Sequence, residues 1–152
     1  PSLQVIIAKS DNVTLPKADK SFKIEKNAKK AIIASDIAIV ASGTATLECA
    51  IEGTPLVVCY KVSALTWLLA KLMVKVKHSS IVNLIAGEKI VPEFLQSEMK
   101  PNIIKNKLIE LIDEKSKIRN QMMKDFLAIK SKLGTPGVYA KIANEILKAT
   151  KT

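Results

Sequence analysis

Short apolar runs alternate along this chain with longer segments whose apolar residues recur at helical spacing. The apolar runs predict strands at residues 3–8, 37–40, 56–61 and 80–84, and the polar stretch 10–26 is predicted as loop with a minor strand at its end. Helices are predicted at residues 27–34, 45–51, 63–76, 101–113, 114–132 and 138–148, with a further helical segment at 92–98. Short strands alternating with helices are typical of an α/β fold, here a parallel sheet with helices on both faces.

Length and composition agree with this fold class. The chain has 152 residues, enough for one domain with a real core, and 48% of them are hydrophobic while only 4% are aromatic. Such an aliphatic core suits the doubly covered strands of a parallel sheet. A Gly- and Pro-containing break separates a main unit, residues 1–134, from a terminal segment, 135–152, whose helix we expect to pack back on the main unit or on a partner.

The net charge favours polyanionic partners. Lysine and arginine together number 24 against 14 acidic residues, which gives a net charge of +10. Nucleic acid, anionic lipid and phosphorylated substrates all fit this excess. We expect no nucleic-acid binding, because aromatic residues for base stacking are few, Arg119 is the one arginine, and the lysines are dispersed.

Metal-ligand patterns are absent from the sequence. Cys49 and Cys59 fall in a predicted helix and strand, so we expect both to be buried, reduced and structural. There is no CxxC pair, and His78 has no evident partner, so we expect neither metal nor cofactor. Reduced cysteines, and an opening Pro1-Ser2 without the basic region of a signal peptide, predict a cytoplasmic location. A start without Met is typical of a processed or partial chain.

The clearest functional pattern is DIAIVASGTATLE, residues 36–48. It predicts a strand, a turn of small residues and a helix, an order in which helix N–H groups and the positive end of the helix dipole face an anion. Glu48 follows one turn later, where a carboxylate can accept hydrogen bonds from a ribose diol. An ordinary connection with a Ser or Thr N-cap explains the local spacing equally well.

Topology gives this motif a setting. In open α/β sheets, ligands bind beyond the carboxyl ends of the strands. We expect three loops there, residues 41–44, 61–63 and the segment after residue 84 that contains Ala86-Gly87-Glu88. Neither a Walker A lysine pattern nor GxGxxG occurs, which disfavours kinases, GTPases and classical dinucleotide-binding proteins.

Several blocks resemble, in order and spacing, the C-terminal half of the lipid-A-disaccharide synthase family of GT-B glycosyltransferases. They lie in ASGTATLECAIEGTPLVVCYKVSALTWLLAKLMVK and VNLIAGEKIVPEFLQ, and the likeness covers residues 35–96 before continuing more weakly. The resemblance implies that residues 1–134 are part of a Rossmann-like UDP-sugar-binding domain. The implied reaction joins UDP-2,3-diacylglucosamine to 2,3-diacylglucosamine 1-phosphate, giving lipid A disaccharide 1-phosphate and UDP without a metal.

The resemblance also implies a set of residues that contact the donor. The small-residue turn would donate to the diphosphate through Ser42, Gly43 and Thr44, and Glu48 would bind the ribose. Asn83 would line the same pocket, and Glu93 and Gln96 would lie near the donor sugar. Each residue type also has an ordinary structural explanation, namely a helix cap, a solvated helix carboxylate, a turn Asn and first-turn residues after a proline.

Two departures from the family pattern limit the expected activity. Residues 86–89 read Ala-Gly-Glu-Lys where the family pattern has Ala-Gly-Arg-Glu, which puts a ligand contact by Glu88 in doubt. The N-terminal acceptor domain with its general base is missing, as are the first strand and helix of the donor domain, so we expect no transfer by this chain alone. A non-catalytic α/β nucleotide-binding module or a split-gene remnant is the alternative, and a UDP-sugar epimerase ranks well behind both.

Two predicted helices suggest partners. The helix 63–76 is too short to span a bilayer, but Trp67, Lys71 and Lys75 would suit a helix lying on an anionic inner-membrane surface. A core helix packed on the sheet explains the same pattern. The last helix could exchange between subunits of a homodimer, as in many GT-B chains.

Overall fold

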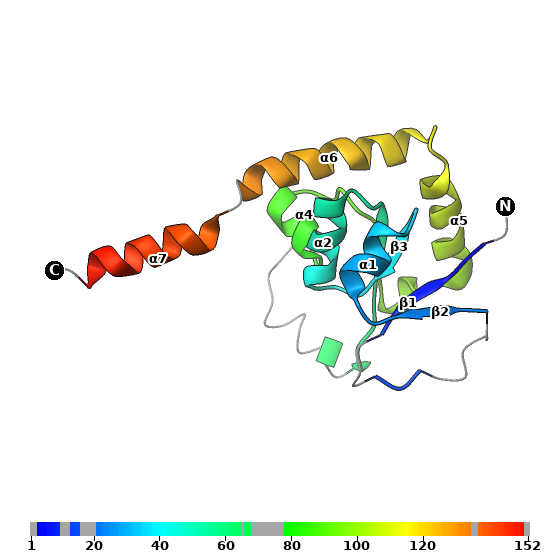
Figure 1. Ribbon diagram of the computed structural model, residues 1–152. Coiled ribbons are helices and arrows are strands. Elements are labelled where there is room, and N and C mark those ends of the chain that lie inside the picture. Colours follow the sequence, from blue (N-terminus) through cyan, green and yellow to red (C-terminus); the bar gives the residue numbers. More distant parts are fainter. Residues whose placement is uncertain are drawn as a thin grey trace.

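The computed structural model describes residues 3–9, 13–15, 21–64, 66–67, 78–134 and 137–150. Figure 1 shows short strands surrounded by helices, with the last helix extending from the rest. The described strands are β1 (Ile6–Ala8), β2 (Lys23–Glu25), β3 (Ala38–Val40), β4 (Leu56–Tyr60) and β5 (Glu93–Leu95). The described helices are α1 (Ala28–Ile33), α2 (Thr44–Glu52), α4 (Ile81–Ala86), the 3-10 helix η1 (Gln96–Glu98), α5 (Pro101–Ile112), α6 (Lys117–Leu133) and α7 (Val138–Ala149).

Every described strand pairing is parallel. One sheet has the order β3-β4-β5, and β1 pairs with β2 in a separate sheet. Helix α2 packs against β3 and β4, α5 packs against β4, and α6 packs against α2 and α4. Parallel strands flanked by helices confirm the predicted Rossmann-like α/β class.

The core forms around β4, which is the central strand of its sheet. Leu56, Val57 and Val58 are completely buried, and Leu111 of α5 and Phe126 of α6 belong to the same apolar cluster. A strand covered on both faces needs apolar residues at consecutive positions rather than in alternation. This explains why the run LVVCY reads as uniformly hydrophobic.

The predicted strand at 80–84 is wrong, and the predicted helical segment at 92–98 is correct only at residues 96–98. Residues 81–86 form helix α4, because the Ser80 hydroxyl caps it by accepting a hydrogen bond from the Asn83 backbone N–H at 3.3 Å. Residues 93–95 form strand β5, and η1 follows it. The segment 86–88 therefore ends a helix and precedes a strand, so it does not lie at a strand's carboxyl end.

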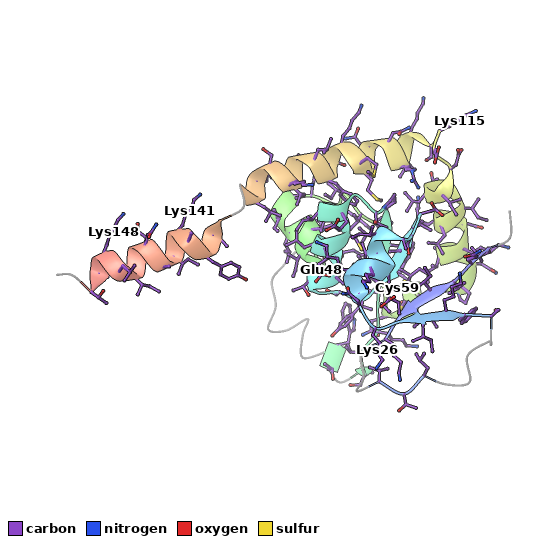
Figure 2. The ribbon with its side chains drawn as sticks, viewed as in Figure 1. Lys26, Glu48, Cys59, Lys115, Lys141 and Lys148 are labelled. Carbon is purple, nitrogen blue, oxygen red and sulfur yellow. The ribbon has the colours of Figure 1, made fainter. Side chains whose placement is uncertain are left out.

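Two segments were predicted to bind partners, residues 63–76 and the last helix. The structure describes the first only in part, and it shows the second as exposed. Ser63 caps a helix start by accepting from the Thr66 N–H at 3.1 Å, but Lys71 and Lys75 lie outside the described residues. Every residue of α7 is exposed, including the apolar stripe Val138, Ile142 and Ile146. In Figure 2 the side chains of α7 project from a helix that stands apart from the others. Docking of α7 on a partner stays a prediction.

Candidate functional site

The strands β3, β4 and β5 end at the same edge of their sheet. Val40 pairs with Val58, and Leu95 pairs with Tyr60, so the loops after these strands lie at one edge. These loops are residues 41–43, residues 61–63 and the start of η1. They replace the predicted set, in which the third loop was 86–88.

The turn before α2 leaves the start of that helix open. Gly43 is the N-cap residue with φ +150° and ψ −163°, a conformation that is essentially restricted to glycine. Among the described residues, no side chain caps this end of α2. The Thr46 hydroxyl instead donates to the Gly43 carbonyl at 2.8 Å and fixes the turn. The Thr46 N–H donates to the same carbonyl at 3.2 Å, so within the described chain the N–H groups of Thr44 and Ala45 are available to an anion.

Ser42 links this turn to a second segment. Its hydroxyl donates to the backbone carbonyl of Ser79 at 2.5 Å. Ser79 and Ser80 in turn bind the carboxylate of Glu93 through both their N–H groups and their hydroxyls, over 2.7 to 3.0 Å. The turn before α2 is therefore connected to strand β5 through hydrogen bonds alone.

Glu93 is a buried carboxylate with a full set of donors. Its side chain is 7% exposed, and it accepts from Ser79, from Ser80 and from the Asn83 amide at 2.8 Å. Burial by itself would raise the pKa of Glu93, but these hydrogen bonds outweigh it and lower the pKa to about 2. The carboxylate is thus charged at neutral pH and stabilised by neutral donors.

Asn83 uses its whole hydrogen-bonding capacity inside the protein. Its Nδ2 donates to the Val91 carbonyl at 3.0 Å and to Glu93, and its Oδ1 accepts from the N–H groups of Ile90 and Val91 at 2.8 and 2.9 Å. A side-chain amide offers two donors and two acceptor sites. The completely buried Asn83 thus closes the turn between α4 and β5.

Glu48 and Gln96 differ from these two residues. Glu48 is half-buried on α2, where Figure 2 labels it, one turn after Thr44 on the same side of the helix, and it makes no hydrogen bond or ion pair with the rest of the described chain. Gln96 directly follows β5 with φ +49°, a left-handed conformation that is unusual for a residue with a side chain. Within the described ranges its buried Nε2 has no hydrogen-bond partner.

The structure thus divides the predicted site residues into two groups. Thr44, Glu48 and Gln96 have donors or acceptors that the described protein does not use, and Gly43 leaves the start of α2 open. Ser42 already donates its hydroxyl to Ser79. Asn83 and Glu93 are saturated.

Sequence reasoning missed three residues that hold the turn before α2 and the Glu93 carboxylate in place: Thr46, Ser79 and Ser80. The pattern Ser80-x-x-Asn83 could have signalled a helix cap rather than a strand.

Of the two cysteines, Cys49 is buried as expected, whereas Cys59 is only half-buried. Burial, reinforced by the neighbouring Glu48 charge, raises the pKa of Cys49 to about 12, and burial raises the pKa of Cys59 as well. Both are free thiols. A thiol that stays protonated at neutral pH is a poor nucleophile and metal ligand.

Metal-binding clusters and membrane-spanning helices are both absent from the residue ranges that the structure describes. No group of three or more His, Cys, Asp or Glu side chains there has the geometry of a metal site. None of the helices in those ranges has the length and apolarity that crossing a bilayer requires.

Comparison with known proteins points to one family. The family model described as lipid-A-disaccharide synthetase matches residues 4–137. The lipid-A-disaccharide synthase of Rickettsia prowazekii is 46% identical over 95 residues, and that of Syntrophus aciditrophicus is 38% identical over 113 residues. The synthase of Myxococcus xanthus is 33% identical across 97% of this chain.

The chain matches only part of each relative. The aligned regions cover 25% of the Rickettsia prowazekii protein, 29% of the Syntrophus aciditrophicus protein and 40% of the Myxococcus xanthus protein.

Proposed function

This chain belongs to the lipid-A-disaccharide synthetase family, and from that premise we propose that it forms the donor-binding part of a glycosyltransferase of lipid A biosynthesis. The donor is UDP-2,3-diacylglucosamine and the acceptor is 2,3-diacylglucosamine 1-phosphate, which give lipid A disaccharide 1-phosphate and UDP. The observation that carries the proposal is the uncapped start of α2 behind Gly43, at the edge where three parallel strands end.

The diphosphate would bind at this helix start. Gly43 holds the turn in a conformation that brings the backbone close to a ligand, and the N–H groups of Thr44 and Ala45 supply donors. Ser42 fixes the turn through its bond to Ser79. Such donors stabilise the negative charge that develops on the leaving UDP, so no metal is required for that task.

Two residues would recognise the rest of the donor. The carboxylate of Glu48, which has no partner in the described chain, would accept hydrogen bonds from the ribose hydroxyls. The unpaired Nε2 of Gln96 would donate to the sugar or to a phosphate oxygen. Strained backbone and orphaned polar groups concentrate at ligand sites, because the ligand supplies the missing interaction.

Asn83 and Glu93 would act by positioning instead of by contact. Their hydrogen bonds hold Ser79 and Ser80, and Ser79 receives the hydroxyl of Ser42. A ligand contact would require one of these internal bonds to break, which is costly for a buried polar group. This assignment divides the predicted set of seven residues into four contacts and three supports, because Ser42 joins Asn83 and Glu93 in holding the turn.

Catalysis needs residues beyond this chain. The acceptor site and general base are assigned to polypeptide in the family that this chain does not match, so we expect no transfer by the chain alone. The second candidate is a nucleotide-binding module without catalytic partners. The open start of α2 supports this second candidate equally. Transferase activity, measured after adding the part of the family's polypeptide that this chain does not match, distinguishes the two candidates.

Calorimetric titration of UDP into the chain tests the site. Glu48→Ala should weaken UDP binding about tenfold, because a charged hydrogen-bond acceptor contributes about 1.5 kcal/mol. Glu52→Ala is the matched control, since it removes the same charge from the same helix but from an ion pair with Lys29 at 2.9 Å. Equal binding by the parent and Glu48→Ala would refute the ribose role, and no UDP binding by the parent would refute the donor site.

Association with a membrane surface is a separate proposal. Trp67 is half-buried, and Lys71 and Lys75 lie outside the described residues. The proposal is supported by the acylated substrates and the net charge of +10. Flotation with anionic vesicles checks it, and binding that persists unchanged when both lysines are replaced by glutamine would exclude this helix as the contact.

A further inference from the structure

The central strand β4 extends beyond β3 at the edge where β3, β4 and β5 end. The last paired residue of β3 is Val40, which lies opposite Val58, whereas β4 continues for two more residues to Tyr60. Each residue of a strand adds about 3.3 Å along its axis, so β4 reaches about 7 Å further than the last pair. The end of β4 therefore reaches the level of residues 41–43, the turn before α2.

Strand β5 brings Gln96 to the same place. Leu95 and Tyr60 form the last pair between β5 and β4. Gln96 and Lys61 each follow a member of this pair, so their backbones lie at neighbouring positions of adjacent strands, which are about 5 Å apart. Lys61 thus follows the central strand between the open start of α2 and the residue whose Nε2 has no partner in the described chain.

Lys61 is the one basic residue in the three loops at this edge. Residues 41–43 read Ala-Ser-Gly, residues 61–63 read Lys-Val-Ser, and residues 96–98 read Gln-Ser-Glu. The carboxylate of Glu98 turns back and accepts from the N–H of Leu95 at 3.5 Å. The positive charge of this edge therefore depends on one side chain and on the dipole of α2.

The ammonium group of Lys61 is available to an anion. The residue is exposed and makes no hydrogen bond or ion pair with any other part of the described chain. Two lysines of α6 differ in this respect, since Lys130 donates to the Ile51 carbonyl at 3.3 Å and Lys132 to the Ile85 carbonyl at 3.2 Å. Those two lysines stabilise the ends of α2 and α4, whereas Lys61 retains all three of its donors.

A diphosphate at this edge requires a positive charge nearby. The start of α2 supplies N–H donors and the equivalent of about half a positive charge. A diphosphate carries more than one negative charge. The carboxylate of Glu93, which is charged at neutral pH, is connected to the same turn through Ser79 and Ser42. Lys61 is placed to offset these negative charges.

We propose that Lys61 binds the diphosphate of the UDP-linked donor together with the open start of α2. The inference rests on the proposed function and adds a contact outside the seven predicted site residues. In the transfer step an acceptor hydroxyl attacks the anomeric carbon of the donor, and its proton passes to the general base outside this chain. The bond from that carbon to the diphosphate oxygen breaks, and its electron pair leaves on UDP. Lys61 stabilises this additional negative charge.

Calorimetric titration of UDP into the 152-residue chain tests the contact. Lys61→Gln should weaken UDP binding about tenfold, because one charge-assisted hydrogen bond to phosphate is lost. Lys61→Arg keeps the positive charge and should bind UDP within about threefold of the parent. Thermal unfolding of both variants should match that of the parent, since the side chain is exposed and unpaired in the described chain.

Lys115→Gln is the matched control. It removes the same charge at an exposed position in the turn before α6, and Figure 2 shows Lys115 far from Glu48 of α2. This variant should bind UDP like the parent. Raising the salt concentration should weaken UDP binding by the parent and by Lys115→Gln more steeply than binding by Lys61→Gln, because screening acts on the charge that this last variant lacks.

The outcomes separate this inference from the proposed function. Equal UDP binding by the parent and Lys61→Gln would overturn the Lys61 contact and leave the donor site intact. If Lys61→Gln instead weakens binding of glucosamine 1-phosphate alone, the lysine belongs to the acceptor phosphate and the proposal is rejected.

Two further results would also count against the contact. Equal losses in Lys61→Gln and Lys115→Gln would assign the effect to the net charge of the chain, and a loss accompanied by a lower unfolding temperature would assign it to folding. Absence of UDP binding by the parent would overturn both the inference and the proposed donor site.

Discussion

Two groups of residues lie near the edge of the sheet where β3, β4 and β5 end. They differ in how completely the protein satisfies their hydrogen-bonding groups. Glu93 and Asn83 are buried, and the structure supplies every hydrogen bond that they can use. Gly43 and Gln96 hold strained backbone conformations, and the buried amide nitrogen of Gln96 has no partner among the described residues. The first group stabilises the fold, whereas the second has the unused groups that our proposed function assigns to a ligand.

The comparison shows how residues that hold the site in place can be distinguished from residues that would contact a ligand, even when both occur in the same sequence blocks. A polar residue that is saturated by its own protein has little to offer a ligand. A polar residue left unsatisfied at a cost in stability indicates that something else completes it. Three predictions test this division, through stability for the first group and through the balance of stability and binding for the second.

The largest effect is expected from the acid sensitivity of Glu93. Its pKa is lowered from 4.5 to about 2 in the folded chain, so folding favours the charged form. The resulting stabilisation is complete above pH 4.5 and is lost as the pH falls toward 2. It amounts to on the order of 3 kcal/mol. Urea denaturation at several pH values measures this loss.

The variant Glu93→Gln removes this titration and should itself be less stable at pH 7 by on the order of 3 kcal/mol, because its NH₂ group would face the donors of Ser79 and Ser80. Glu98→Gln, an equal charge change at an exposed position, should shift stability by less than about 0.5 kcal/mol. If Glu93→Gln retains the parent's acid sensitivity, the buried carboxylate is not its source.

Sequence reasoning captured the regular parts of the fold and missed the part that depends on tertiary partners. The strand 56–61 and the helix after Gly43 were predicted to within one or two residues, because apolar runs and turn residues report local structure directly. Residues 80–84 are apolar enough for a strand, but Ser80 caps a helix there. Periodicity cannot distinguish short apolar segments, and the buried network that selects helix is formed with residues ten or more positions away.

The candidate site was predictable by residue type but not by role. The family resemblance gave seven residues, and Thr44, Glu48 and Gln96 retain donors or acceptors that the described chain does not use. Asn83 was predicted to line the nucleotide pocket and Glu93 to lie near the donor sugar, because both residues occur in the matching blocks. Their burial and their partners follow from the pairing of β5 with β4, which no local pattern encodes.

Gly43→Ala should destabilise the fold less than the loss of the Glu93 charge does, but it should weaken UDP binding strongly. The conformation at φ +150° should cost about 1 to 3 kcal/mol with a Cβ present, although no neighbouring atom lies within 4 Å of it. UDP affinity should fall at least tenfold, because relief of the strain moves the first N–H groups of α2. Gly87→Ala, also at positive φ but at the end of α4, is the control.

Gly87→Ala should lose comparable stability and keep the UDP affinity of the parent. Thermal unfolding and calorimetry on the same samples give both quantities. If both variants lose affinity in proportion to stability, the turn at Gly43 contributes to folding alone, and the proposed distinction between support and contact fails for this residue.

The smallest change in stability is expected at Gln96, and its sign is the informative part. Gln96→Gly should stabilise the fold by removing the strain of φ +49° and a buried amide that has no partner in the described chain. It should also destabilise the fold somewhat, because glycine adds backbone freedom to the unfolded chain. These terms should leave a net gain of about 0.5 kcal/mol. Binding of a UDP-sugar should weaken about fivefold, since the Nε2 donor is lost. If Gln96→Gly raises stability and weakens binding, Gln96 is maintained for its ligand. If the variant loses both stability and affinity, Gln96 belongs with Glu93 and Asn83.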